Sequence, residues 1–280
     1  MTSVPNITLN NGVEIPQLGF GVYLVPPEDT KETVLSAFEV GYRHIDTAQM
    51  YGNEAGVGQA FAESGLARDD VFITSKLNNT FHAHDDALRE IDGTLERLGV
   101  DQVDLFLIHW PMPGIDIDYV ETWKAMEEIY VAGKARAIGV SNFLSHHLRR
   151  LDDETDIVPA ANQIEIHPYL QQQDVRATSA ELGIAVEAWS PIAQGQILDD
   201  AVVLAVADEV GRTAAQVVLR WHVQRGDIVF PKSMSRERMV ENFGLFDFEL
   251  DQSQIDRITG LERDGRVGPD PETFNWIPKA

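Results

Sequence analysis

The chain of 280 residues contains no cysteine. Disulfide bonds, thiolate catalysis and cysteine-ligated metal sites are therefore excluded, whereas a metal held by histidine, aspartate and glutamate remains open. No run approaches the roughly 20 consecutive apolar residues of a membrane span. The amino terminus also lacks the basic segment and apolar core of a signal peptide. We therefore expect a cytoplasmic protein that does not enter a membrane.

Basic residues are also few. The 22 lysines and arginines face 45 aspartates and glutamates, which gives a formal net charge of −23, and lysine is especially scarce. Such a charge disfavours nucleic acid and anionic membranes as partners, because both bind through basic contacts. An anionic small molecule would need local basic residues to reverse the field at its site. Two explanations of the charge stay open: solubility combined with a genomic preference for arginine, and adaptation to high salt.

No linker, low-complexity tract or charge block divides the chain, so residues 1–280 are interpreted as one domain. Short apolar runs alternate with amphipathic stretches. Residues 7–9, followed by the turn Asn10-Asn11-Gly12, indicate an opening hairpin. Candidate strands then occupy residues 18–23, 42–47, 71–77, 103–109, 135–140, 160–166, 185–190 and 227–231. Helical patterns include residues 29–40, 85–98, 119–132 and 214–224, with glycines at expected helix ends.

Eight strands that alternate with helices predict a parallel sheet of the α/β class. That count over this length favours a closed (β/α)8 TIM barrel, with the hairpin capping its bottom and the chemistry at the carboxyl ends of the strands. An open dinucleotide-binding sheet would instead carry G-x-G-x-x-G after its first strand. Here Gly19-Phe20-Gly21 lies within that strand and Leu24 occupies the third glycine position, which argues against a Rossmann fold.

Four polar residues follow three consecutive candidate strands. Asp46 ends the second strand and Tyr51 comes shortly after it, Lys76 lies near the end of the third, and His109 ends the fourth. Because neighbouring strand ends converge in a barrel, these side chains are expected to form one cluster. The set suits carbonyl reduction. A phenol with a pKa of about 10 can protonate the carbonyl oxygen, and a nearby ammonium lowers that pKa. A carboxylate holds the ammonium, and an imidazole orients the carbonyl.

Each of these residues also has a structural interpretation. Lys76 and Asp46 would form an ion pair at the barrel rim, Tyr51 would be a surface residue at a helix start, and His109 would be a buried histidine with satisfied hydrogen bonds. Four suitable residue types at three consecutive strand ends favour the catalytic interpretation. A metal-dependent barrel hydrolase using His44, Asp46 and His109 is a further alternative, although no tight ligand spacing is present.

Three motifs resemble those of the aldo-keto reductase family. GYRHIDTA at residues 41–48 with YGNE at 51–54 resembles its first signature, and IGVSNF at 138–143 resembles its central motif. PKS at 231–233, with Arg238 and EN at 241–242, resembles its nucleotide-binding motif. The likeness runs from residue 7 to residue 264. It implies that Tyr51 donates the proton, that Lys76 and Asp46 tune it, and that His109 helps to bind the carbonyl.

The same resemblance implies NADPH as the cofactor, extended across the barrel mouth. Ser141, Asn142 and Gln163 would hydrogen-bond the nicotinamide carboxamide. Trp189, with Ser190 beside it, would stack on the nicotinamide ring, where many relatives carry tyrosine. Cationic donors suit a 2′-phosphate. The residues implied to hold that phosphate and the adenine are Lys232, Ser233, Arg238, Glu241 and Asn242, with Arg236 as an additional candidate.

The substrate pocket is predicted from aromatic residues at or near strand ends. Phe20, Tyr23 and Trp110 would wall a pocket around His109; the alternative is that they pack the rim. The family often has tryptophan two residues after the strand-three lysine, and this chain has Asn78 there. A wider or more polar pocket is therefore expected.

The carboxyl-terminal tail, residues 263–280, corresponds to a variable segment that closes over the site in relatives. Its Phe274 and Trp276 would either contact substrate or pack the tail down. The overall pattern is most similar to the bacterial 2,5-diketo-D-gluconate reductase branch, with small dicarbonyls, aldehydes and keto-sugars as expected substrates of a monomeric enzyme. An NADPH-binding barrel that acts as a redox sensor or interaction subunit is the alternative, and the intact set of four residues argues against it.

Overall fold

Eight parallel strands form the centre of the protein, seen in a computed structural model that describes residues 4–277. Residues 1–3 and 278–280 lie outside the described residues, so the ends of the predicted domain (1–280) and of the predicted tail (263–280) are not covered. The strands follow one another around the sheet in chain order. They are β3 (Phe20–Gly21), β4 (His44–Asp46), β5 (Phe72–Leu77), β6 (Val103–Ile108), β7 (Ala135–Ser141), β8 (Ala161–Glu165), β9 (Ala185–Trp189) and β10 (Ile228–Val229).

The sheet closes into a barrel between its first and last strands. Leu18 forms a parallel bridge with Val229. The Gly19 N–H donates to the Val229 carbonyl at 2.8 Å, and the Val229 N–H donates to the Gln17 carbonyl at 3.0 Å. The predicted (β/α)8 barrel is therefore confirmed. The observed strands lie within the predicted ranges, except that β7 extends one residue further, to Ser141.

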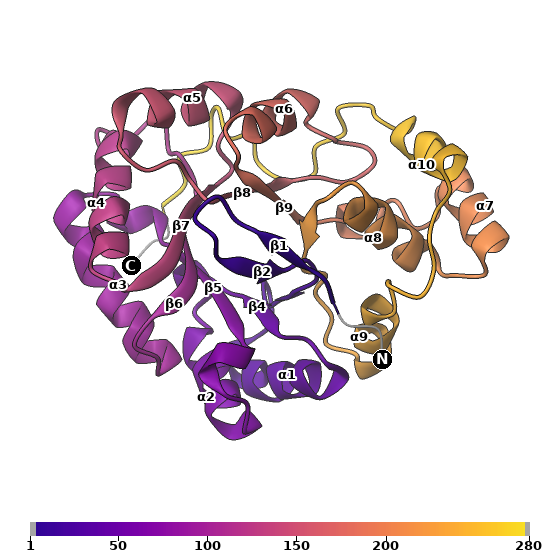
Figure 1. The fold of residues 1–280 in the computed structure, drawn as a ribbon, viewed down its shortest axis with the longest axis horizontal. Coiled ribbons are helices and arrows are strands. Elements are labelled where there is room, and N and C mark those ends of the chain that lie inside the picture. The colour runs from indigo at the N-terminus through magenta and orange to yellow at the C-terminus, as the bar shows by residue number, and fades with distance from the viewer. Residues whose placement is uncertain (1–3, 278–280) are drawn as a thin grey trace.

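Helices surround this barrel (Figure 1). The four helices with predicted bounds begin and end within two residues of the prediction. Gly99 ends one of them in the left-handed conformation, with φ at 67°, which glycine adopts without steric cost. The helices are α1 (Pro27–Val40), α2 (Glu54–Ser64), α3 (His84–Leu98), α4 (Tyr119–Val131), α5 (Ser145–Glu154), α6 (Gln173–Glu181), α7 (Ala201–Val210), α8 (Ala214–Gln224), α9 (Arg236–Phe243) and α10 (Gln252–Thr259), with short 3-10 helices η1 (Gln49–Tyr51), η2 (Arg68–Asp70), η3 (Asn79–Phe81) and η4 (Ala193–Gly195).

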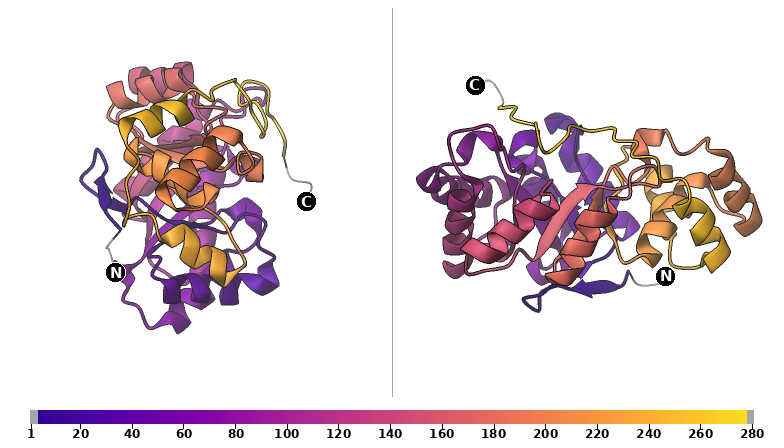
Figure 2. Two further views of the ribbon diagram at one scale, coloured as in Figure 1. Left: turned by 90° about the vertical axis from the view of Figure 1, so that its right-hand side faces the viewer. Right: turned by 90° about the horizontal axis from the view of Figure 1, so that it is seen from above.

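The amino-terminal hairpin covers one end of the barrel. Its strands β1 (Asn6–Thr8) and β2 (Glu14–Pro16) pair antiparallel. At its turn, the Asn10 and Asn11 side chains donate to the carbonyls of Pro159 and Arg136, both at 3.0 Å. These carbonyls lie near the amino-terminal ends of β8 and β7. Figure 2 shows the hairpin and the carboxyl-terminal tail on opposite faces of the molecule. The strand carboxyl ends therefore form the opposite end of the barrel, on the side of the tail.

The barrel interior changes from apolar to polar along its axis. Toward the hairpin, a fully buried Ile15 packs in a cluster with barrel residues such as Leu105, Leu107 and Ile228. Toward the strand carboxyl ends, the buried side chains become charged or polar. That upper layer includes Asp46, Lys76, Gln163 and Glu187. The lower layer closes the barrel, and the upper layer holds the groups available for chemistry.

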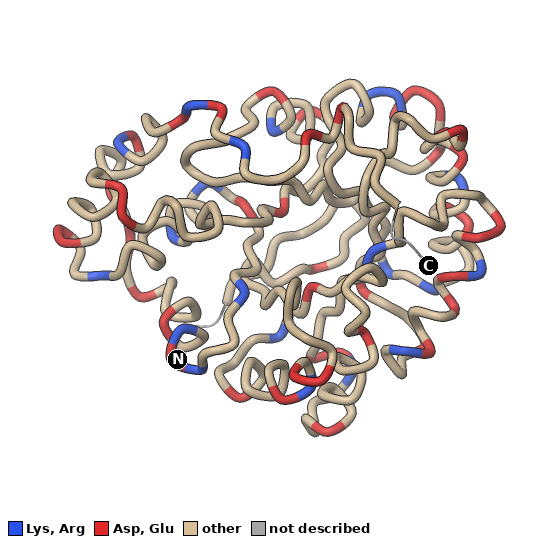
Figure 3. Tube along the Cα trace, turned by 180° about the vertical axis from the view of Figure 1, so that it is seen from behind, with Lys and Arg blue, Asp and Glu red and all other residues tan. Residues whose placement is uncertain are grey.

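Acidic residues are spread over the whole molecule. Figure 3 shows them on helices all around the barrel, with basic residues interspersed and no single acidic segment. Such a distribution sets the overall field without defining a partner surface. Within residues 4–277, no helix combines the length and apolar character needed to cross a membrane.

Helix packing around the barrel predicts opposite effects at two helical glycines. A Cβ at Gly58 in α2 would lie 2.5 Å from the Leu98 carbonyl oxygen, whereas a Cβ at Gly93 in α3 would meet only the end of the Arg97 side chain, at 2.9 Å. Gly58→Ala should lower the free energy of unfolding by about 1–3 kcal/mol through overpacking. Gly93→Ala should raise it by up to about 1 kcal/mol through helix propensity. Chemical denaturation measures both, and equal effects would contradict this description of the α2–α3 contact.

Candidate active site

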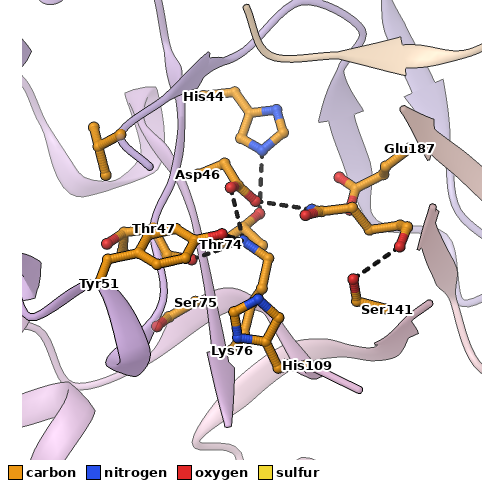
Figure 4. Close-up of polar contacts among 12 residues, drawn as sticks. His44, Asp46, Thr47, Tyr51, Thr74, Ser75, Lys76, His109, Ser141 and Glu187 are labelled. Carbon is orange, nitrogen blue, oxygen red and sulfur yellow. Dashed lines mark hydrogen bonds and ion pairs between the residues drawn. The ribbon is translucent and has the colours of Figure 1, made fainter. Parts of the chain in front are cut away.

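The four residues predicted from the strand ends do come together at the barrel mouth. The Lys76 ammonium, on a fully buried side chain of β5, donates to Asp46 Oδ1 at 2.7 Å, to the Thr47 carbonyl at 3.0 Å and to the Tyr51 hydroxyl at 3.4 Å. The His109 ring lies edge-to-face against the Tyr51 ring, with 5.7 Å between centroids. Figure 4 shows all four side chains pointing into one space.

The loop after β4 places Tyr51 against Lys76. The chain turns from Asp46 into η1 and leaves it at Gly52, whose φ is 67°. Asn53 holds this loop from beneath: its Oδ1 accepts from the Thr47 hydroxyl at 2.8 Å, and its Nδ2 donates to the Val22 carbonyl at 2.9 Å. Asn53 is therefore a supporting residue: it belongs to the first motif, but the sequence alone indicated no role for it.

Burial sets the protonation state of Tyr51. Loss of solvent raises the pKa of its phenol to about 12, although the neighbouring Lys76 ammonium acts in the opposite direction. The ammonium therefore acts in the expected direction, but burial of the phenol outweighs the nearby charge, so the net pKa in the free protein lies above the ordinary value. Tyr51 is consequently a neutral hydroxyl at physiological pH, with a proton available to donate.

Lys76 is held in its charged form and His109 in its neutral form. Burial works against the Lys76 ammonium, but Asp46 and Tyr51 together bring the pKa of Lys76 above its ordinary value. Burial, with Lys76 as a second cause, lowers the pKa of His109 well below its ordinary range. The histidine is therefore a neutral imidazole that carries one N–H. The arrangement thus offers a charged ammonium behind the phenol and a neutral hydrogen-bond donor beside it.

The predicted nicotinamide contacts form a second cluster next to the first. Ser141 donates from its hydroxyl to the Gln163 carbonyl at 2.8 Å. Asn142 Nδ2 donates to the His109 carbonyl at 2.9 Å and to Ser141 Oγ at 3.1 Å. Asn142 Oδ1 accepts from the Trp189 indole N–H at 2.8 Å. Within residues 4–277, Gln163 Oε1 receives no hydrogen bond, so this cluster offers an acceptor to an amide NH₂. A nicotinamide carboxamide fits that requirement. Ser190, next to Trp189, is partly exposed and takes a positive φ of 49°.

The predicted phosphate-binding segment presents cations around the start of α9. Lys232 and Arg238 are exposed, and neither forms an ion pair within the described residues, whereas Arg236 lies 3.3 Å from Glu39. An exposed pair of cations suits a bound phosphate. Among the other predicted contacts, the Ser233 hydroxyl accepts from the Ser235 N–H, Glu241 accepts from the Thr213 hydroxyl, and Asn242 is nearly buried.

The carboxyl-terminal tail is anchored at the end of β8. Glu165, which is fully buried, accepts from the backbone N–H of Val267 at 2.6 Å and of Gly268 at 3.0 Å, and lies 3.0 Å from His167 Nε2. Gly268 then passes so close to Trp189 that a Cβ there would lie 2.3 Å from the indole ring. The tail therefore packs directly on the side chain predicted to stack on the nicotinamide.

Further along, the tail crosses to the loops after β5 and β6. The Asn275 side chain accepts from the Gly114 N–H at 2.6 Å, and Asn79 Nδ2 donates to the Trp276 carbonyl at 2.9 Å. The Phe274 ring packs at a tilt against Trp110 with 4.2 Å between centroids. Phe274 thus packs the tail onto the mouth, and Trp276 remains half exposed.

The three residues predicted in or near the substrate pocket differ in what they contact. Phe20 is fully buried and packs edge-to-face on Tyr42 within the main core, so its assignment to the pocket is wrong: its ring faces the core and is inaccessible to a ligand. Tyr23 remains at the mouth, 57% exposed, with its ring centroid 5.1 Å from that of Tyr51. Asn78 caps η3 by accepting from the Thr80 N–H at 3.1 Å. The Asn78 side chain therefore stabilises the start of η3.

The alternative metal site fails on the position of His44. Its ring nitrogens lie 3.3 Å from the Pro16 carbonyl and 3.1 Å from the Thr74 hydroxyl, toward the hairpin end. Asp46 is occupied by Lys76. Among the described residues, the one group of three side chains placed to share a metal is His146, His147 and Glu272, which includes none of the residues of that alternative.

The barrel fold, with its buried aspartate and lysine against a partly buried tyrosine, is the arrangement of a barrel oxidoreductase. A family model described as the aldo/keto reductase family matches residues 17–203 and 197–263. The chain is 51% identical over 272 residues to an aldo-keto reductase of Mycolicibacterium smegmatis, covering 97% of this chain and 98% of that one. It is 47% identical to the glyoxal reductase of Bacillus subtilis, covering 95% and 96%, and 45% identical to the methylglyoxal reductase DkgA of Escherichia coli, covering 96% and 97%.

Solved structures agree with this result. The aldo-keto reductase of Bombyx mori, in complex with NADP, superposes with a TM-score of 0.91 at 36% identity over 97% of both chains. An aldo/keto reductase of Brucella melitensis superposes with a TM-score of 0.89 at 45% identity over 92% of this chain and 100% of that one. The chain belongs to the aldo/keto reductase family and is an NADP(H)-dependent oxidoreductase. The names of these relatives do not single out the 2,5-diketo-D-gluconate reductase branch.

The tail anchor predicts a local change in mobility. Glu165→Ala leaves the Val267 and Gly268 amides without their acceptor. Hydrogen bonds to a charged group contribute about 1.5–3 kcal/mol, so amide exchange in residues 263–277 should accelerate roughly ten- to a hundredfold. Hydrogen–deuterium exchange measures this directly, and Glu272→Ala, which removes an exposed carboxylate from the same tail, serves as the control. Equal exchange in both variants would mean that the contacts of Asn275 and Phe274 hold the tail by themselves.

Proposed function

We propose that the protein reduces small activated carbonyl compounds, above all 1,2-dicarbonyls such as methylglyoxal, with NADPH as the reductant and Tyr51 as the proton donor. The observation that carries this proposal is that the buried Lys76 ammonium contacts both Asp46 and the Tyr51 hydroxyl. Tyr51 is a neutral phenol beside the positive charge of Lys76. It can therefore donate a proton, and the ammonium stabilises the phenolate that remains.

Bound NADPH supplies a hydride to the carbonyl carbon, and negative charge then develops on the carbonyl oxygen. Tyr51 transfers its proton to that oxygen, which leaves a phenolate 3.4 Å from the Lys76 ammonium. The ammonium stabilises the phenolate as it forms, so the cluster favours the transition state over the ground state. Asp46 keeps the lysine charged and in place, and neutral His109 donates its N–H toward the carbonyl oxygen.

The cofactor contacts are proposed from the free hydrogen-bonding capacity described above. Gln163 Oε1 accepts from the carboxamide NH₂, Ser141 and Asn142 are the other proposed contacts of the carboxamide, and Trp189 covers one face of the ring. At the other end, Lys232 and Arg238 hold the 2′-phosphate, with Ser233, Glu241 and Asn242 around the adenosine. These cations reverse the field of an acidic protein at the point where an anionic cofactor must bind.

Two observations and one chemical argument support the proposed substrate class. Trp110, Tyr23 and Phe274 present aromatic surface around the polar centre, which suits a compact ligand with one reacting carbonyl. An adjacent electron-withdrawing carbonyl also makes hydride attack easier. Two of the relatives are named glyoxal reductase and methylglyoxal reductase. The keto-sugar 2,5-diketo-D-gluconate remains a candidate substrate within the same class.

Assays of NADPH oxidation with methylglyoxal, an aromatic aldehyde, an aldose and 2,5-diketo-D-gluconate test the proposal. Tyr51→Phe should lower kcat by roughly a hundred- to ten-thousandfold, the usual contribution of a general acid. Its NADPH affinity should be unchanged, because only the hydroxyl is lost. Tyr23→Phe is the control: it removes a hydroxyl from the same mouth and should retain activity. Full activity in Tyr51→Phe would remove Tyr51 from the mechanism, and no turnover of any carbonyl by the unmodified protein would favour a sensor or interaction role.

Arg238 gives a separate test of the cofactor site. Arg238→Ala should weaken NADPH binding about ten- to a hundredfold while leaving NADH binding nearly unchanged, since the guanidinium is proposed to contact only the extra phosphate. Fluorescence titration of both cofactors measures the difference. Arg257→Ala, which removes an exposed arginine paired with Glu209 instead, controls for the loss of a surface charge. Equal weakening of NADPH and NADH would assign Arg238 to the fold or to the shared adenosine.

A further inference from the structure

A buried carboxyl beneath the barrel mouth takes no part in the chemistry described so far. Glu187 lies on β9 and is fully buried. Its Oε2 accepts from Gln163 Nε2 at 3.0 Å. Its Oε1 is buried without a hydrogen-bond partner among the described residues. Figure 4 shows this side chain directed into the same interior as Asp46 and Lys76.

The charges in this layer do not balance if both carboxyls are ionised. Lys76 is the one ammonium among them, and it donates directly to Asp46 Oδ1 at 2.7 Å. No hydrogen bond from Lys76 reaches Glu187 within residues 4–277. A second buried negative charge next to Asp46 would be uncompensated, and such a charge is expensive in a medium of low dielectric constant. The proton is therefore expected on Glu187, and Asp46 stays the partner of the ammonium.

The surroundings of Glu187 agree with a neutral carboxyl. Burial first, and the charge of Asp46 second, raise the pKa of Glu187 to about 8, against the opposing effects of the Gln163 hydrogen bond and of Lys76. The titratable groups that act on it are thus Asp46 from β4 and Lys76 from β5. The adjacent strands β8 and β10 place Gln163 and Ile228 beside it in register, and neither titrates.

The two carboxyls together determine the orientation of the Gln163 amide. Gln163 Nε2 donates to Asp46 Oδ2 at 2.9 Å and to Glu187 Oε2 at 3.0 Å, which uses both amide protons. The reversed amide would direct its oxygen at two carboxyl groups that offer at most one proton between them. Gln163 Oε1 is therefore left as the free group, and Gln163 can only accept a hydrogen bond from a ligand.

We propose that Glu187 is a positioning residue: as a neutral carboxylic acid it holds the Gln163 amide with its oxygen free for the nicotinamide carboxamide, and its ionisation slows carbonyl reduction. This inference rests on the roles proposed for Gln163 and Tyr51. Ionised Glu187 adds a negative charge to the layer behind Tyr51. That charge disfavours the phenolate that forms when Tyr51 gives up its proton, so Tyr51 becomes a weaker acid.

The direction of the pH effect follows from this sign. Below about pH 8 Glu187 is protonated and the reductase has its full rate; above that pH the rate falls. Tyr51 itself loses its proton only near pH 12, so it does not account for a decline near pH 8. The decline should be roughly three- to tenfold, as expected for one unit charge that lies in the same buried layer without contacting the phenol.

Glu187→Gln and Glu187→Met separate positioning from simple filling of space. Glutamine keeps the acceptor for Gln163 Nε2, has the shape of the neutral acid and cannot ionise. It should show near-normal kcat at pH 6.5 and NADPH affinity, and should lack the decline near pH 8. Methionine fills the space but leaves one Gln163 proton without an acceptor. It should weaken NADPH binding about three- to tenfold, the effect of one neutral hydrogen bond. An unchanged decline in Glu187→Gln, or equal NADPH affinity in both variants, would overturn the proposal.

A measurement that needs no catalysis distinguishes failure of this inference from failure of the proposed function. A carboxyl with a folded-state pKa of about 8 and an ordinary unfolded value stabilises the protein fully below pH 4.5, and this contribution is lost as the pH rises to 8. Thermal melts from pH 5 to pH 9 should therefore show the wild type losing stability relative to Glu187→Gln. Glu54→Gln, at a buried carboxyl that binds Ser75 and Arg97, is the matched control and should parallel the wild type. Parallel curves for wild type and Glu187→Gln would refute a neutral Glu187, whatever the activity assays show.

Discussion

The buried ion pair of Lys76 and Asp46 is the interaction on which the rest of this site depends. An isolated ammonium at zero exposure would be too costly to keep charged, and a pair that loses one partner typically costs a protein about 3–5 kcal/mol. The pair exists because β4 and β5 are neighbours in parallel register, with Asp46 opposite Thr74 and Lys76 two residues further along. Residues two apart in a strand face the same side, so both side chains enter the barrel at adjacent levels.

Other parts of the site are arranged around that pair. The ammonium has donors left for the Thr47 carbonyl and the Tyr51 hydroxyl, which ties the loop after β4 to β5. The second oxygen of Asp46 accepts from Gln163 on β8. The Lys76–Asp46 ion pair thus links Tyr51, the proposed proton donor, to Gln163, the residue proposed to bind the cofactor amide. The closed sheet of the barrel brings these residues within reach of one another.

Charge operates on two scales in this protein. A net charge of −23 would repel an anionic cofactor at long range, but many basic side chains are already matched by local acids. Arg68 and Arg136 share Asp104, and Arg97 pairs with Glu54. Lys232 and Arg238 differ because no acid pairs with them among the described residues. Cations left unpaired on an acidic surface provide a local attraction that screening by salt confines to short distances.

The order of strands and helices was determined by the sequence itself, because apolar periodicity and glycine helix ends are local properties. The same pattern, with the motifs around Asp46, Ser141 and Lys232, indicated the family and the four residues at the strand ends. Contacts between distant segments were decided only by the tertiary structure. Burial raised the pKa of Tyr51, and Phe20 was buried in the core. Glu165 and Asn79 formed hydrogen bonds with the backbone of the carboxyl-terminal tail. Glu187 on β9 and Gln163 on β8 also came within hydrogen-bonding distance. Each of these depends on which side chains lie within a few ångströms after closure, and no local pattern encodes that distance.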